Sequence, residues 1–181
     1  VLVVTPASLK TEWEEQIQRF TELPYQLVFG NRARRMKAYE LASGRGAGET
    51  PALLPFFTIV NYEQMLADSL EVNQRLRPDV VVLDEAQRIK NWSTKTTQAV
   101  KRLRSRYAFI LTGTPIENRI DELYSLMDFL NPSLLGPLFR FNRDYYDLDD
   151  RGRPAGYRNL DKLHERIKPH IAETSVLINR A

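Results

Sequence analysis

The stretch Asp79–Asn91 reads DVVVLDEAQRIKN, and the rest of the chain is interpreted around it. Its short run of β-branched apolar residues is typical of a strand buried on both faces. The acids Asp84 and Glu85 follow directly, at the carboxyl end of the strand, where open α/β sheets bind their ligands. Two unpaired carboxylates beside a core are unfavourable, because they lose solvation and repel each other.

A divalent cation would remove most of this repulsion. Mg²⁺ prefers one or two protein carboxylates and takes its other oxygen ligands from water and from nucleotide phosphates. The pair Asp84 and Glu85 therefore indicates Mg²⁺-dependent phosphoryl chemistry. For an isolated Asp-Glu pair, the alternative of two solvated acids in a β-to-α loop carries more weight, so other stretches have to decide.

Composition limits the class of protein. The chain has 181 residues, 43% hydrophobic and 27% charged, which is enough for one domain with a real core. No apolar run approaches the roughly 20 residues of a membrane span. The absence of cysteine excludes disulfides and thiolate metal sites, and two histidines argue against zinc. We expect an intracellular protein, whose net charge of +3 permits an anionic partner. Because the chain opens with Val1 inside an expected strand, we also expect a segment of a longer polypeptide.

Apolar runs alternate with helical patterns along the first three quarters of the chain. Strands are predicted at residues 1–4, 25–29, 56–60, 79–83 and 106–111, and helices at residues 5–20, 31–42, 61–76, 94–103 and 120–130. This alternation predicts an α/β fold, a parallel sheet with helices on both faces. The ends of two strands, at residues 84–85 and 112–114, then lie on one edge of that sheet. Further helices are predicted at residues 139–148 and 160–168, around a charged turn.

A glycine-rich segment superficially imitates a phosphate-binding loop. Residues 44–50 read GRGAGET, but Glu49 occupies the place where a lysine would meet the phosphates, and its carboxylate repels them. No strand leads into the segment and Pro51 follows it. We interpret residues 43–55 as an ordinary loop.

Several stretches together resemble the first RecA-like lobe of the Swi/Snf-type DNA translocases, a branch of the superfamily-two helicase-like ATPases. The resembling stretches are VLVVTPASLK with Trp13 (motif Ia), residues 58–63 (motif Ib), residues 83–91 (the DExx or DExH box), residues 111–118 (motif III), and residues 131–136. The resemblance covers nearly the whole chain, and the DExx box and motif III are highly specific. Residues 147–163 are more similar to bacterial than to nuclear members.

The resemblance implies roles for the residues that match its motifs. Asp84 would hold Mg²⁺ through its water shell, and Glu85 would orient and polarise the water that attacks ATP. Gln87 stands where His is commoner and would sense the γ-phosphate. The motif III residues Thr112, Gly113 and Thr114 would couple hydrolysis to movement of the two lobes. The two threonines could alternatively cap the helix that follows them.

The resemblance also implies contacts with double-stranded DNA that do not depend on its sequence. The residues concerned are Pro6, Ser8, Lys10, Asn61, Tyr62, Lys90 and Asn91. For Lys90 and Asn91 a surface turn is an equal alternative. Helical spacing makes Trp13 a core residue, and the basic run Arg32–Lys37 is interpreted as a solvated helical face, although it could touch phosphates.

The resemblance places a RecA-like ATPase lobe at residues 1–135 and a helical extension toward a second lobe at residues 136–181. It places the Walker A loop upstream of motif Ia, so we expect this chain alone to be inactive and to bind ATP weakly or not at all. Where the family has an Arg-Arg stretch near the second lobe, this chain has His170–Thr174, which departs from the pattern.

These stretches favour part of a DNA-dependent ATPase that couples ATP hydrolysis, with Mg²⁺, to translocation on DNA. The parent protein would remodel protein–DNA complexes, with DNA-bound proteins such as RNA polymerase as partners, in a bacterial cytoplasm and away from membranes. The alternative is a non-catalytic nucleic-acid or protein docking module built on a degenerate ATPase lobe. A restriction-type translocase subunit is disfavoured by the RIKN sequence at residues 88–91.

Overall fold

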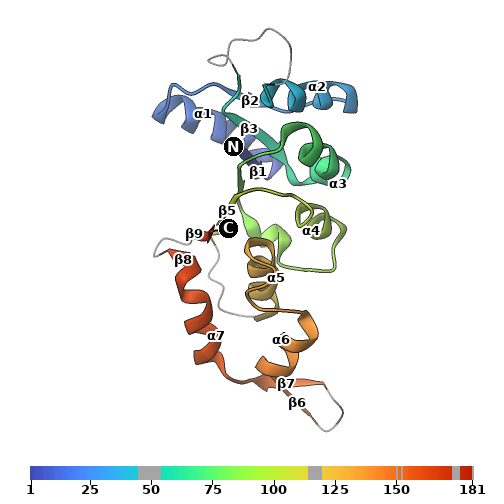
Figure 1. The fold of residues 1–181 in the computed structure, drawn as a ribbon, viewed down its shortest axis with the longest axis vertical. Coiled ribbons are helices and arrows are strands. Elements are labelled where there is room, and N and C mark those ends of the chain that lie inside the picture. Colours follow the sequence, from blue (N-terminus) through green and yellow to red (C-terminus); the bar gives the residue numbers. More distant parts are fainter. Residues whose placement is uncertain (45–53, 114–119, 150, 152, 173–175, 181) are drawn as a thin grey trace.

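A computed structural model describes residues 1–44, 54–113, 120–149, 151, 153–172 and 176–180. Strands and helices alternate in the first part of the chain (Figure 1). They are β1 (Leu2–Thr5), α1 (Lys10–Phe20), β2 (Tyr25–Leu27), α2 (Arg32–Ala42), β3 (Phe57–Asn61), α3 (Tyr62–Glu71), β4 (Val80–Leu83), α4 (Lys95–Val100), β5 (Tyr107–Leu111) and α5 (Ile120–Leu130). Short helical turns at Ala7–Leu9, Val72–Leu76 and Ala86–Ile89 join some of them. Each predicted strand in this part is present.

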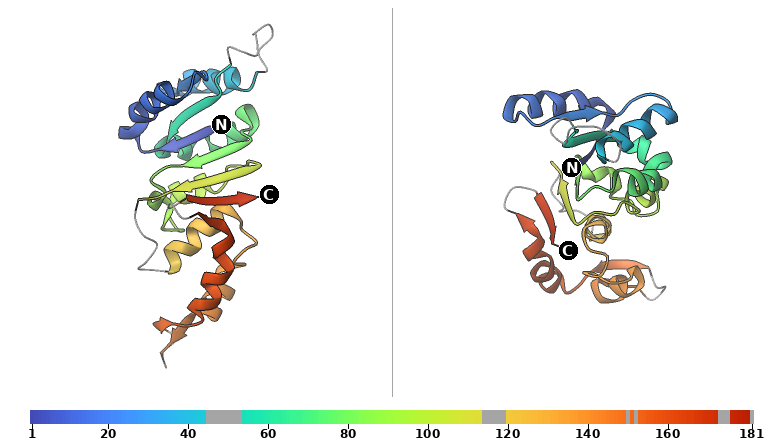
Figure 2. Two further views of the ribbon diagram at one scale, coloured as in Figure 1. Left: turned by 90° about the vertical axis from the view of Figure 1, so that its left-hand side faces the viewer. Right: turned by 45° about the horizontal axis from the view of Figure 1, so that its top comes forward.

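The first five strands form a parallel sheet, as the sequence predicts, and their order is β2-β3-β1-β4-β5. Figure 2 shows these strands side by side. The sheet is then extended by two antiparallel strands, β9 (Val176–Arg180) beside β5 and β8 (Ile171–Ala172) beside β9. These two strands are not among those predicted from the sequence.

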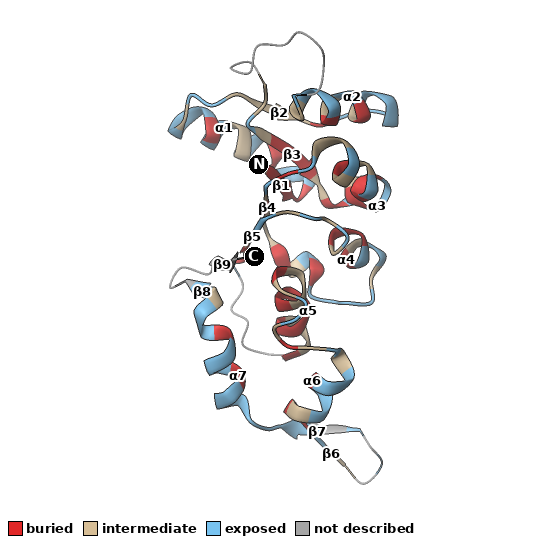
Figure 3. Cartoon of the chain, in the orientation of Figure 1, coloured by how far each residue is buried: buried red, intermediate tan, exposed pale blue. Residues whose placement is uncertain are grey.

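Helices cover both faces of the sheet, which confirms the predicted fold class. On one face, Val3 of β1 and Ile59 of β3 pack against Ile17 of α1. The alternate residues of the strands point to the other face, where they form the larger core with α2, α3, α4 and α5. Figure 3 shows the buried sides of these helices turned toward the sheet.

The arrangement follows from the direction of the connections. The chain leaves β1 through α1 to reach β2 at one edge, whereas it leaves β4 through α4 to reach β5 in the opposite direction. Right-handed crossovers then require α1 and α4 to lie on opposite faces. The neighbouring strands β1 and β4 therefore flank a topological switch point, and ligands of open α/β sheets bind at such points.

The C-terminal part is mostly helical and holds α6 (Leu138–Tyr145) and α7 (Leu160–Ile167), with a hairpin of β6 (Tyr146–Leu148) and β7 (Pro154–Tyr157) between them. The predicted helix at residues 139–148 is wrong over its last three residues, which belong to β6. The ring of Phe141 lies 4.8 Å from that of Tyr124 and 4.9 Å from that of Tyr145, so α6 packs on α5. The boundary at residue 135 stays a prediction. Within the described ranges no helix could span a membrane.

Candidate active site

The acids Asp84 and Glu85 lie at the carboxyl end of β4, on the edge of the sheet where β1 and β3 also end. The backbone N–H of Asp84 donates to the carbonyl of Val4 at 2.9 Å and so extends the β1–β4 ladder by one bond. Glu85 has φ +51°, in the left-handed region. For a residue with a side chain this conformation costs about 1–3 kcal/mol, and such strain gathers at functional sites. It turns the chain from β4 into the helical turn Ala86–Ile89.

The carboxylate of Asp84 is held by three hydrogen bonds. Its Oδ2 accepts from the Thr5 hydroxyl at 2.9 Å and from the Trp13 indole N–H at 2.8 Å. Its Oδ1 accepts from the backbone N–H of Glu85 at 3.0 Å. The backbone carbonyl of Asp84 accepts from the buried hydroxyl of Tyr62 at 2.7 Å. Asp84 is therefore fixed by elements from β1, α1 and α3.

Glu85 is connected to the end of the next strand through Gln87. The side-chain amide of Gln87 donates to Glu85 Oε2, and its oxygen accepts from the Thr112 hydroxyl at 3.1 Å. The structure thus brings together Glu85, Gln87 and Thr112, which the sequence analysis had grouped. Gly113 is exposed beside them, and Thr114 lies outside the described residues.

A hollow of about 340 Å³ opens beside the acid pair. It is lined by Leu9, Glu12, Trp13, Gln16, Asp84 and Glu85. No ion pair to Asp84 or Glu85 is found among the residues that the structure describes, so neither carboxylate is neutralised by a cation of that part of the chain. The acids therefore lie at an accessible edge, as the sequence analysis expected.

The donor set fits Mg²⁺. The described part of the chain holds no group of three or more His, Cys, Asp or Glu side chains that could enclose a metal ion. A cation at Asp84 and Glu85 must accordingly complete its coordination shell with water or phosphate oxygens. Mg²⁺ typically binds in this way, whereas zinc prefers a shell of protein nitrogen and sulfur ligands. The glycine-rich segment, from residue 45 onward, lies outside the described residues.

The residues expected to face DNA from β1 and α1 are only partly exposed. Ser8 is exposed, whereas Pro6 is buried. Lys10 is 3% exposed; its ammonium donates to the carbonyl of Val28 at 2.5 Å and lies 4.2 Å from the centre of the Phe29 ring. Desolvation lowers the pKa of Lys10 to about 8. Lys10 thus holds the loop after β2 in this structure, and its contact with DNA stays a prediction.

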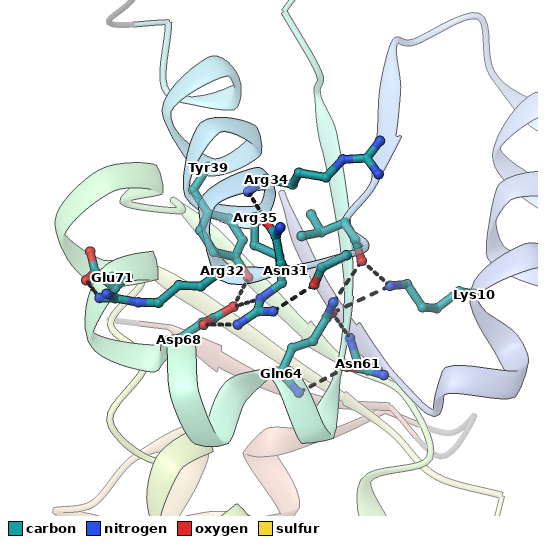
Figure 4. Close-up of polar contacts among 12 residues, drawn as sticks. Lys10, Asn31, Arg32, Arg34, Arg35, Tyr39, Asn61, Gln64, Asp68 and Glu71 are labelled. Carbon is teal, nitrogen blue, oxygen red and sulfur yellow. Dashed lines mark hydrogen bonds and ion pairs between the residues drawn. The ribbon is translucent and has the colours of Figure 1, made fainter.

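Asn61 and Tyr62 have structural contacts at the start of α3. The side chain of Asn61 accepts from the Gln64 backbone N–H at 3.0 Å, and the side chain of Gln64 accepts from the Asn61 backbone N–H at 2.9 Å. This is a capping box, and Figure 4 shows it next to Lys10. Tyr62 is 1% exposed, so the expected contact of its side chain with DNA is not possible in this structure.

Lys90 and Asn91 lie on the α5 side of the edge. Lys90 pairs with Glu122 at 3.1 Å, and Asn91 Oδ1 accepts from the Ser93 backbone N–H at 3.0 Å. Both are exposed and line a hollow of about 300 Å³ together with Trp92, Asp121 and Glu122. The structure thus supports the surface-turn alternative for Asn91 without testing a DNA contact.

Sequence reasoning missed Thr5 and Trp13. The interpretation of Trp13 as core is half right, since its ring packs against the cluster of Val3, Ile17 and Ile59. Its N–H, however, bonds Asp84. One signal was available: a tryptophan whose ring is packed into a protein still needs a partner for its N–H.

Comparisons with known proteins show which sequences and structures this chain is similar to. The family model described as SNF2-related domain matches residues 1–180. The chain is 33% identical over 167 residues to the DNA repair and recombination protein RAD54B of Gallus gallus, and 30% identical over 171 residues to the putative ATP-dependent helicase/translocase YwqA of Bacillus subtilis. These alignments cover 91% and 94% of this chain but 17% of each relative.

A solved structure, the Sulfolobus solfataricus SWI2/SNF2 ATPase core in complex with dsDNA, is similar to this chain with a TM-score of 0.69 and 30% identity. The match covers 94% of this chain and 32% of that one. A second solved structure, the Sulfolobus solfataricus SWI2/SNF2 ATPase core domain, matches with a TM-score of 0.66 and 31% identity over 93% of this chain and 31% of the other.

Proposed function

This chain belongs to the SNF2-related domain family, and from that premise we propose that it forms part of an ATPase that moves along double-stranded DNA. The observation that carries the proposal is the acid pair at the switch point between β1 and β4. Asp84 is fixed there by hydrogen bonds, and Glu85 is linked through Gln87 to Thr112. An isolated pair of solvated acids would need neither connection.

Asp84, Glu85 and Gln87 would have different roles in ATP hydrolysis. Asp84 would hold Mg²⁺ through its water shell, and the bound ion would neutralise charge that develops on the phosphate oxygens. Glu85 accepts the hydrogen bond of the attacking water and orients it toward the γ-phosphorus. The amide of Gln87 holds the Glu85 carboxylate, and the same amide would carry a change at Glu85 to Thr112. This connection supports the coupling role proposed for Thr112 to Thr114.

The proposed substrate track is the backbone of duplex DNA. Support comes from the dsDNA complex of the similar Sulfolobus core and from the exposed Ser8 at the active edge of the sheet. Contacts of this kind position a protein on DNA without reading its sequence. We extend the proposal to the remodelling of DNA-bound complexes in the parent protein, with RNA polymerase as an example, in a bacterial cytoplasm.

The test uses the parent polypeptide that contains this chain. We expect Glu85→Gln to lower DNA-stimulated ATP hydrolysis by about 100-fold or more, the usual contribution of a general base, while DNA binding is retained. Glu15→Gln is the matched control, since Glu15 is exposed on α1 and loses the same charge. Hydrolysis that survives in Glu85→Gln would refute the role of Glu85 and favour the docking-module alternative.

A further inference from the structure

Trp13 links the packing of α1 to the acid pair. It is partly buried, and its ring packs against the apolar cluster on the α1 face of the sheet. Its indole N–H donates to Asp84 Oδ2 at 2.8 Å, across 71 residues of sequence. A phenylalanine could pack on the same cluster, but its ring is smaller and has no N–H to donate. The tryptophan therefore does something that packing alone does not require.

Among the residues that the structure describes, the hydrogen bonds to Asp84 leave one part of its carboxylate unused. A carboxylate has about four acceptor positions, two on each oxygen. On Oδ2 both positions are taken, by Thr5 and Trp13. On Oδ1 one position is taken by the Glu85 backbone N–H. The remaining position belongs to Oδ1. We call the Thr5 hydroxyl, the Trp13 indole N–H and the Glu85 backbone N–H the Asp84 clamp.

We propose that Trp13 and Thr5 are positioning residues, and that the Asp84 clamp turns the free side of Oδ1 toward a water molecule of the Mg²⁺ shell. This inference rests on the proposed function and deepens it. Hydrogen bonds to an ionised acceptor are short and strong. The clamp therefore restricts rotation of the carboxylate before any ligand binds. Residues that orient a metal ligand typically change metal affinity or activity by about 10–100-fold when they are mutated.

The first experiment tests the clamp without any reaction. The chain has two tryptophans, Trp13 and Trp92, so a ¹⁵N-labelled sample gives two indole N–H signals, and Trp92→Phe assigns them. We expect Asp84→Asn to shift the Trp13 proton signal upfield and to speed its exchange with solvent, because the bond to a charged acceptor is lost. The Trp92 signal should not move. Glu15→Gln is the matched control, and an unmoved Trp13 signal in Asp84→Asn overturns the proposal.

The second experiment tests the metal role on the same chain. Mn²⁺ replaces Mg²⁺ as the probe, and electron paramagnetic resonance measures the free ion. We expect Trp13→Phe and Thr5→Val each to weaken Mn²⁺ binding about tenfold or more, and Thr5→Ser to restore it. Urea unfolding of each variant identifies any loss of fold. Equal Mn²⁺ affinity in Trp13→Phe and wild type, or no Mn²⁺ binding to the wild type, overturns the proposal.

The proposed function and the Asp84 clamp are tested by different measurements, so one can be refuted without the other. The catalytic role of Glu85 is judged by hydrolysis in the parent polypeptide, whereas the Asp84 clamp is judged by the indole signal and by Mn²⁺ affinity. In the parent, Trp13→Phe should raise the Mg²⁺ concentration that gives half-maximal hydrolysis about tenfold, with kcat at saturating Mg²⁺ changed only a few-fold. A lower kcat with unchanged Mg²⁺ dependence would overturn the positioning role and leave the proposed function standing.

Discussion

Arg32 and Arg35 lie three residues apart on α2 but have different surroundings (Figure 4). Arg35 makes two bonds to the fully buried Asp68, at 2.5 and 2.8 Å, and Tyr39 donates to the same carboxylate at 3.0 Å. Arg32 pairs with Glu71, but its side chain is 69% exposed. An unpaired buried charge is far more unfavourable than a lost surface pair.

We therefore predict that Arg35→Ala lowers the free energy of unfolding by about 3–5 kcal/mol. Arg32→Ala, the matched control on the same helix, should lower it by less than about 1 kcal/mol. Urea denaturation of both variants measures the difference. Similar costs for the two variants would show that the Arg35–Asp68 pair does not hold α2 against α3.

The buried Lys10 makes the stability of the protein depend on pH. Burial lowers its pKa to about 8, whereas an unfolded lysine has a pKa of about 10.4. Between these pH values the unfolded chain binds a proton that the folded chain does not, so Lys10 makes stability rise with pH. Below pH 8 its contribution is constant and unfavourable.

Lys10→Met removes the contribution of this side chain to the pH dependence of stability. Urea midpoints at pH 7, 8 and 9.5 should show stability of the wild type gaining on that of Lys10→Met as the pH rises. Burial raises the pKa of Tyr39 and Tyr62, but both chains contain these residues and their effect cancels in the comparison. Curves that run parallel over this range would contradict the burial of Lys10.

At single residues, sequence patterns predicted the positions of side chains in the fold better than their contacts. The pair of acids after an apolar run was enough to place Asp84 and Glu85 at the edge of the sheet. The basic run Arg32–Lys37 was interpreted as solvated, yet Arg35 is in a buried ion pair. Its partner Asp68 is 33 residues away, and no local pattern shows which side chains meet across such a distance.

Among the elements, α3 has the clearest start signal. Asn61 and Gln64 form its capping box, and Asn61 is also a residue expected to face DNA. Asn61→Ala should destabilise the protein by about 1 kcal/mol, because an unsatisfied helix N–H is left. Asn61→Asp should keep the cap, since aspartate accepts the same bond.

These two variants separate the structural role of Asn61 from a DNA role. If Asn61 also lies near phosphates, Asn61→Asp should weaken duplex binding by charge repulsion at nearly unchanged stability, as measured by fluorescence anisotropy at fixed salt. Unchanged DNA affinity in Asn61→Asp would restrict Asn61 to its structural role.

The buried strands were predictable because each is a short apolar run with a clear boundary. The hairpin of β6 and β7 was not, since Tyr146–Leu148 continues the composition of the helix before it. Strand β9 was missed for another reason. It pairs with β5, more than 60 residues earlier in the chain, and a pairing between distant segments leaves no local pattern.

On the scale of the whole molecule, the sheet order determines where the site lies. The order β2-β3-β1-β4-β5 puts β1 next to β4, and only this adjacency lets Thr5 and Trp13 reach Asp84. Alternating strands and helices predict a parallel sheet, but they do not predict its order. The acid pair was therefore located by sequence, while the residues that hold it required the fold.

The charges at this edge of the sheet also predict how tightly the isolated chain binds ATP. Two carboxylates at the edge attract Mg²⁺ but repel a triphosphate, unless backbone amides and a lysine of a phosphate-binding loop compensate. Glu49 makes residues 44–50 unsuitable for that role. A calorimetric titration of this chain with Mg-ATP should show no micromolar dissociation constant, while the parent polypeptide should bind. Micromolar binding by the chain alone would mean that it contains a phosphate site of its own, and residues 44–50 would be the first segment to mutate.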